Sequence, residues 1–169
     1  IITNITPDHL DRYNHDMEEY VKAKFRITRN MSSEDCFIFC SDDEITINHL
    51  NKIVVKAKQL PFTQKTEVAQ GAFVKDDKIV IRYQDSECDM YIRELALGGR
   101  HTVYNSMAAA IAAKVMDIDN GTIREALSSF QPVEHRLEKV ASVGGVLYVN
   151  DSKATNVDAA WYALECQKQ

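Results

Sequence analysis

The chain has 169 residues, of which 45% are hydrophobic and 27% charged, and its net charge is −5. This length suits one globular domain, or one domain with part of a second. The acidic balance and the lack of a basic cluster argue against nucleic acid as a partner. No apolar run approaches the ~20 residues that span a bilayer. We therefore expect a cytoplasmic protein without membrane insertion, whose four cysteines remain free thiols.

The β-branched run Ile1–Ile5 predicts a strand, and the chain then turns at Pro7. A helix is expected next, and its spacing places six residues on one mostly apolar face: Met17, Tyr20, Val21, Lys24, Ile27 and Thr28. On such a face, lost hydration would favour the neutral amine of Lys24, which could then act as a nucleophile or take up carbon dioxide as a carbamate. The alternative is a lysine that extends to water.

Asp8 and His9 lie in the turn before this helix. A histidine together with a carbamate would make a plausible nitrogen and oxygen site for a hard divalent cation. An Asp-His pair after a strand is also common as a simple turn or helix cap. The local pattern leaves both interpretations open.

The middle of the chain predicts a β-rich scaffold. Cys36–Cys40 has the composition of a buried strand, residues 44–50 suit a short helix, and Pro61 suggests a break. A hairpin is expected where residues 71–74 and 78–83 flank Lys75-Asp76-Asp77.

A second helix should follow Gly98-Gly99 and place His101 and Asn105 on one face. Its buried face is predicted from Tyr104, Met107, Ala108, Ile111 and Val115. The stretch from Thr122 to Glu125 is a capping-box pattern, which predicts that a further helix starts there. The linker around Pro132 suggests a domain boundary.

Two strands joined at Gly144-Gly145 are expected after this boundary, the second of them covered on both faces. A polar stretch, residues 151–156, follows at the carboxyl end of that strand, where α/β sheets bind ligands. A helix from Val157 is expected to bury Ala160, Trp161 and Leu164. The 38 residues from 132 onward are fewer than the ~50 of a small domain, so we expect the chain to stop inside its second domain.

Three stretches in this order resemble the signature motifs of the Mur ligases, the ATP-dependent enzymes that build the peptide stem of peptidoglycan. They are Thr6 to Tyr13 with Lys24, Gly99 to Ala109, and Asn150 to Asn156. The last stretch is most similar to that of the members that add D-glutamate. The resemblance implies an α/β fold: residues 1–131 would be the C-terminal part of a central ATPase-type domain, and residues 132–169 the start of a Rossmann-like C-terminal domain.

The same resemblance implies an activity and its site. The parent enzyme would join D-glutamate to UDP-N-acetylmuramoyl-L-alanine through an acyl phosphate, with ATP and Mg²⁺ as cofactors. His9 and carbamylated Lys24 would hold or orient a magnesium ion, with Asp8 in the same cluster. The remaining implied contacts are Asn105 to adenine, Asp151 to ribose, Arg136 to the phosphates, and Lys153 and Thr155 towards D-glutamate.

The sequence departs from the family pattern in two respects. Thr102 stands where the family usually has asparagine, and no G-x-x-x-x-G-K-[ST] phosphate loop occurs. We therefore expect a piece of a longer ligase that is inactive by itself. Two alternatives are a ligase similar to folylpolyglutamate synthetase, against which the stretch from Asp151 to Asn156 argues, and a non-catalytic interaction domain derived from a ligase.

Overall fold

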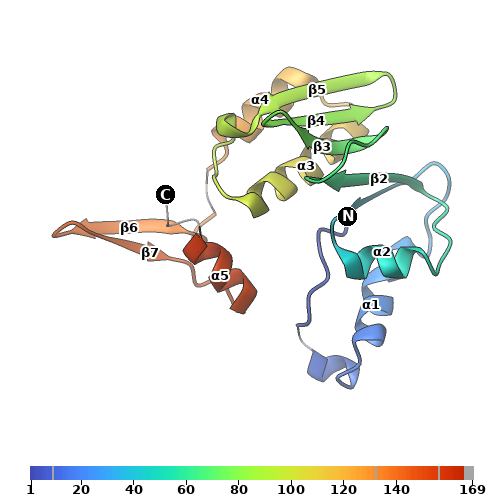
Figure 1. The fold of residues 1–169 in the computed structure, drawn as a ribbon, viewed down its shortest axis with the longest axis horizontal. Coiled ribbons are helices and arrows are strands. Elements are labelled where there is room, and N and C mark those ends of the chain that lie inside the picture. Colours follow the sequence, from blue (N-terminus) through green and yellow to red (C-terminus); the bar gives the residue numbers. More distant parts are fainter. Residues whose placement is uncertain (9, 132, 156, 166–169) are drawn as a thin grey trace.

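The computed structural model describes residues 1–8, 10–131, 133–155 and 157–165 (Figure 1). Its main part is a five-stranded sheet in the order β1-β2-β3-β4-β5. The strands are β1 (Cys36–Cys40), β2 (Lys58–Thr63), β3 (Gly71–Lys75), β4 (Lys78–Tyr83) and β5 (Ser86–Tyr91). The first three strands are parallel, whereas β3, β4 and β5 pair antiparallel. The predicted hairpin is confirmed, with Lys75 opposite Lys78 at its turn.

Strand β1 contributes to two hydrophobic clusters because successive side chains of a strand point to opposite faces. Phe37 and Phe39 pack with the N-terminal helices, while Ile38 and Cys40 pack with the helix on the other face of the sheet. All four residues are buried. The prediction of a buried strand is therefore confirmed, and the strand separates two layers of the core.

The N-terminal layer consists of η1 (Leu10–Tyr13), α1 (Met17–Phe25), η2 (Arg26–Thr28) and α2 (Glu44–Leu50). The expected strand at the N-terminus is reduced to a single bridge between Ile2 and Phe39. The apolar face predicted for α1 is wrong in its second half. Helix α1 buries Tyr20, Val21 and Phe25 but leaves Lys24 exposed, and after Phe25 it gives way to η2. The Lys24 ammonium lies 5.0 Å from the centre of the Tyr20 ring.

Helix α3 (Arg100–Val115) covers the other face of the sheet and packs on β1 to β4 (Figure 1). Met107, Ala108 and Ile111 are buried there, as predicted. The small side chains of Ala108 and Ala110, both buried, let the helix approach the sheet closely. The short η3 (Ile92–Glu94) precedes α3.

Helix α4 (Asn120–Ser129) begins earlier than the capping pattern at Thr122 predicted. Asp119 is the N-cap, and its side chain accepts a hydrogen bond of 3.0 Å from the backbone N–H of Thr122. Only Ile123 of this helix is buried, and Phe130 beyond its end is half exposed.

A separate unit follows, made of the two-stranded antiparallel sheet β6 (Glu138–Val143) and β7 (Val146–Asn150) and the helix α5 (Val157–Glu165). The hairpin at Gly144-Gly145 is as predicted. The expected burial is wrong, because Val146, Leu147 and Tyr148 in β7 are exposed, and so are Ala160, Trp161 and Leu164 in α5. The apolar side chains of this unit have no second layer to cover them among the described residues.

Candidate functional site

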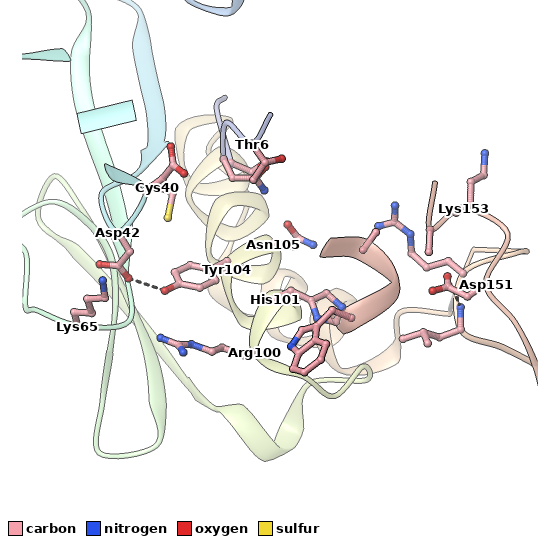
Figure 2. Close-up of a pocket in the computed structure, with 18 residues that line it drawn as sticks. Thr6, Cys40, Asp42, Lys65, Arg100, His101, Tyr104, Asn105, Asp151 and Lys153 are labelled. Atoms are coloured by element: carbon pink, nitrogen blue, oxygen red, sulfur yellow. Dashed lines mark hydrogen bonds between the residues drawn. The ribbon is translucent and has the colours of Figure 1, made fainter. Parts of the chain in front are cut away.

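A pocket of about 650 Å³ lies between α3, the ends of β1 and β2, and the C-terminal unit (Figure 2). This volume is within the range of small-molecule sites. Strands β1 and β2 are parallel, so the residues that follow them meet at one edge of the sheet. Its lining residues include Thr6, Cys40, Asp42, Asp43, Lys65, Arg100, His101, Tyr104, Asn105, Arg136, Asp151, Lys153 and Trp161.

The first turns of α3 supply the central wall of the pocket. Arg100, His101, Tyr104 and Asn105 line it together because positions three and four apart share one face of a helix. The helix begins after Gly99, whose φ of 100° is a backbone conformation that glycine adopts at little cost. The expectation that His101 and Asn105 share a face is therefore confirmed.

Asp42 is the most strongly bonded acid of the pocket. Its carboxylate accepts hydrogen bonds of 2.7 Å from the Thr63 hydroxyl and 2.7 Å from the Gln64 backbone N–H. It also accepts a bond of 2.8 Å from the Tyr104 hydroxyl, which Figure 2 shows as a dashed line. Burial by itself would raise the pKa of Asp42, but these bonds and the charge of Lys65 hold it below its ordinary value. Asp42 is therefore an anion at neutral pH.

Two neighbouring groups are kept neutral by the same surroundings. Burial is the main cause that raises the pKa of Tyr104, and the hydrogen bond to Asp42 raises it further. The Tyr104 hydroxyl therefore remains a donor. Burial also raises the pKa of the Cys40 thiol to about 11, although hydrogen bonds from the backbone N–H groups of Asp42 and Asp43 lower it; the negative charges of the two carboxylates raise it. A neutral thiol is a poor nucleophile, so Cys40 is a lining residue and not a reactive one.

The C-terminal unit lines the pocket through Arg136, Asp151 and Lys153. Figure 2 shows Asp151 and Lys153 on the side of the pocket across from α3. The Asp151 carboxylate accepts a hydrogen bond of 3.2 Å from the backbone N–H of Leu137. The backbone N–H of Lys153 donates to the carbonyl of His135 at 3.1 Å. These bonds join the segment before β6 to the loop after β7, so that Arg136 and Asp151 are presented together although fifteen positions separate them.

The structure brings four of the predicted site residues to this pocket: Asn105, Arg136, Asp151 and Lys153. Asp8, Lys24 and Thr155 are not among the described residues that line it, and His9 lies outside the described residues. The described part of the chain contains no group of three or more His, Cys, Asp or Glu side chains that could hold a metal ion. The metal site predicted at His9 and Lys24 therefore stays a prediction.

Sequence reasoning missed several lining residues. Asp42 and Lys65 follow directly on strands, and their position at the carboxyl ends of β1 and β2 was the signal that could have revealed them. Trp161 was expected in a core but is 64% exposed and contributes to the pocket. The pocket is lined by four cationic side chains, those of Lys65, Arg100, Arg136 and Lys153, and by the carboxylates of Asp42, Asp43 and Asp151. No helix among the described residues is long and apolar enough to cross a membrane.

The fold and the pocket define a mixed α/β domain with a candidate ligand pocket at the carboxyl ends of parallel strands. Residues 1–113 match the family described as the Mur ligase middle domain, and the chain therefore belongs to the Mur ligase family.

Curated relatives extend the match over nearly the whole chain. A UDP-N-acetylmuramoylalanine–D-glutamate ligase of Bacteroides fragilis is 51% identical over 165 residues, which are 98% of this chain and 37% of the relative. A protein of the same name from Christiangramia forsetii is 47% identical over 165 residues, with the same shares of the two chains covered. The chain thus spans little more than a third of the length of these relatives.

Solved structures show the same fold at low sequence identity. The crystal structure of MurF from Acinetobacter baumannii has a TM-score of 0.76 at 17% identity, covering 99% of this chain and 37% of that one. A mutant of the L. casei protein FPGS has a TM-score of 0.62 at 19% identity, covering 99% of this chain and 42% of that one. The likeness to MurF confirms the predicted α/β fold class.

Proposed function

We propose that this chain is part of an ATP-dependent, cytoplasmic ligase that joins D-glutamate to the carboxyl group of UDP-N-acetylmuramoyl-L-alanine. The observation that carries the proposal is the pocket, which Asn105 on α3 lines together with Arg136 and Asp151 of the C-terminal unit. The curated relatives named for this activity support the same substrates. We place a domain boundary between residues 131 and 132, so that the pocket lies between the two domains.

The nucleotide occupies this pocket in our proposal. Asn105 has both a donor and an acceptor in its amide and can recognise an adenine edge. Asp151 accepts hydrogen bonds from ribose hydroxyls. The planar guanidinium of Arg136 can bind two phosphate oxygens at once, which a lysine cannot do.

The reaction has two steps. The carboxylate of UDP-N-acetylmuramoyl-L-alanine attacks the γ-phosphorus of ATP, which forms an acyl phosphate and releases ADP. The amine of D-glutamate then attacks the acyl carbon, so that the new amide bond replaces the bond to phosphate and inorganic phosphate leaves. Lys153 and Thr155 face the carboxylates of D-glutamate and hold its amine near the acyl carbon, an entropic contribution to the rate.

A magnesium ion is also proposed, with His9 and carbamylated Lys24 as its ligands or orienting groups and Asp8 in their cluster. The ion would supply charge neutralisation at the transferred phosphoryl group. The described residues offer no complete ligand set, and Lys24 is exposed.

The proposal is tested in the full-length enzyme by release of inorganic phosphate that depends on both D-glutamate and UDP-N-acetylmuramoyl-L-alanine. Arg136→Lys should raise the KM for ATP by about tenfold, because one of two phosphate contacts is lost. The matched control is Arg93→Lys, since the Arg93 guanidinium lies over the Tyr91 ring and not in the pocket.

Two results would contradict the proposal. Glutamate transfer to a folate but not to the uridine nucleotide would favour an enzyme similar to folylpolyglutamate synthetase. Nucleotide binding without ligation of any acceptor would favour a non-catalytic domain. The chain of 169 residues by itself should show no ATP-dependent ligation.

A further inference from the structure

The first two turns of α3 carry two of the pocket's polar side chains, His101 and Asn105, yet the helix has a weak local start. Among the residues that the structure describes, no side chain caps the helix at Gly99. The Thr102 hydroxyl donates 3.0 Å to the carbonyl of Gly98, and this bond satisfies none of the free N–H groups at the helix start. The orientation of these turns must therefore come from contacts with other elements.

Two hydrogen bonds supply those contacts, and both lead to the carboxyl ends of β1 and β2. The Gln64 side-chain amide donates 2.9 Å to the backbone carbonyl of Arg100, and the Tyr104 hydroxyl donates 2.8 Å to the Asp42 carboxylate. The Tyr104 ring also packs on Phe62 of β2, with 6.2 Å between the ring centres. The Tyr104 bond joins residues 62 positions apart and fixes the rotation of α3 one position before Asn105.

The acceptor of the Tyr104 bond is itself held in place. Asp42 accepts from the hydroxyl of Thr63, which is fully buried, and from the backbone N–H of Gln64. The Thr63 hydroxyl in turn accepts a bond of 3.0 Å from the backbone N–H of Lys65. Asp42 therefore has no freedom to follow Tyr104, and the helix must adapt to the sheet.

We propose that Asp42 and Tyr104 are a positioning pair that fixes the first turns of α3 so that Asn105 and His101 present a preorganised surface to the nucleotide. This inference rests on the proposed function. Neither residue of the pair takes part in the chemistry. The bond between them is charge-assisted, and such bonds are stronger than those between neutral groups.

The test uses the full-length enzyme and the variant Tyr104→Phe, which removes the hydroxyl but keeps the ring on Phe62. We expect the KM for ATP to rise about tenfold, while kcat and the KM for D-glutamate change less than twofold. In an Asp42→Ala background the same substitution should add less than a twofold further change, because the acceptor of the Tyr104 bond is already absent. The matched control is Tyr83→Phe, since the Tyr83 hydroxyl lies 3.8 Å from the Cys36 sulfur, outside the pocket.

An unchanged KM for ATP in Tyr104→Phe would contradict the positioning role proposed for Asp42 and Tyr104. So would a parallel loss of kcat, of every substrate's affinity and of thermal stability, because that pattern indicates general unfolding. Amide hydrogen exchange gives a readout that does not need activity: residues 101–105 should exchange faster in Tyr104→Phe than in the unsubstituted protein. If the unsubstituted enzyme shows no ligation, the proposed function is wrong. If hydrogen exchange at residues 101–105 is unchanged in Tyr104→Phe, the positioning role of Asp42 and Tyr104 is wrong.

Discussion

Gly71 and Pro61 approach each other so closely that a Cβ atom at position 71 would lie 2.0 Å from the carbonyl oxygen of Pro61. Gly71 also has a φ of 115°, which side chains disfavour. The contact lies where β3 begins to pair with β2, at Phe62 and Thr63. Pro61 itself is a correction to the expected break, because it lies inside β2, opposite Phe39 of β1. Strand β3 pairs only with Phe62 and Thr63, the two residues after Pro61. On that side Pro61 therefore has no ladder partner, which is where a strand tolerates proline.

This contact predicts a sharp cost for Gly71→Ala. The added methyl group must displace backbone and also occupy a strained φ, so we expect a loss of about 2–4 kcal/mol of unfolding free energy. Gly144→Ala is the matched control, because its φ is also positive but nothing lies within 4 Å of its Cβ position. Denaturant unfolding of the two variants measures the difference. Equal losses would show that backbone strain alone, and not the contact with Pro61, limits position 71.

The packing of α3 on the sheet predicts a second stability difference between two methionines. Met107 is fully buried, and Met107→Ala should cost about 2–5 kcal/mol through lost burial and the cavity left behind. Met116, just after the helix, is 74% exposed, and the same substitution there should change stability by no more than about 0.5 kcal/mol. Thermal and denaturant unfolding of Met107→Ala and Met116→Ala measure the two losses of stability. Similar losses in the two variants would contradict the burial of Met107 in the core.

Lys24 remains the sharpest catalytic prediction. In the intact enzyme Lys24→Ala should nearly abolish turnover, and acetate should partly restore it by occupying the place of a carbamate beside the metal. Lys22→Ala is the control, because Lys22 only forms an exposed ion pair of 3.1 Å with Glu18. Near-normal turnover of Lys24→Ala would reduce Lys24 to a surface lysine over the Tyr20 ring.

Thr102 tests the alignment of α3 with the family pattern. Thr102→Asn should tighten ATP binding or leave it unchanged, because it restores an amide near the expected adenine. Thr102→Ser keeps the hydroxyl that bonds the Gly98 carbonyl and should bind ATP as the unsubstituted enzyme does. Calorimetric titration of the full-length enzyme with ATP compares the three proteins. A large loss of affinity in Thr102→Asn would mean that this helix is misaligned with the family.

Asp42 predicts part of the acid sensitivity of the fold. Although burial opposes the shift, its hydrogen bonds lower the pKa of Asp42 in the folded state below the ordinary aspartate value of about 3.9. A depressed carboxyl pKa stabilises the fold above that ordinary value, and the contribution is lost as the pH falls through the folded pKa. The melting temperature should therefore decrease as the pH drops below about 4, and this decrease should be less steep in Asp42→Asn. Parallel curves for the two proteins would contradict the role of this carboxylate.

The sequence by itself determined the features that depend on near neighbours. The run from Cys36 to Cys40 predicted a buried strand, the turn after Lys75 predicted a hairpin, and helical spacing predicted that Met107 and Ile111 lie in the core. These predictions hold because strand alternation and helical periodicity are local properties. The resemblance to a family also drew attention to Asn105, Arg136, Asp151 and Lys153, which line one pocket.

Only the tertiary structure decided which distant residues meet. No local pattern reveals that Asp42 accepts a hydrogen bond from Tyr104, because strand order and register place them together. The errors have the same origin: Lys24 and Trp161 have apolar neighbours in sequence, yet both are exposed. Burial depends on which layer covers a face, and a helix or strand can be amphipathic in sequence without a described element packing against it.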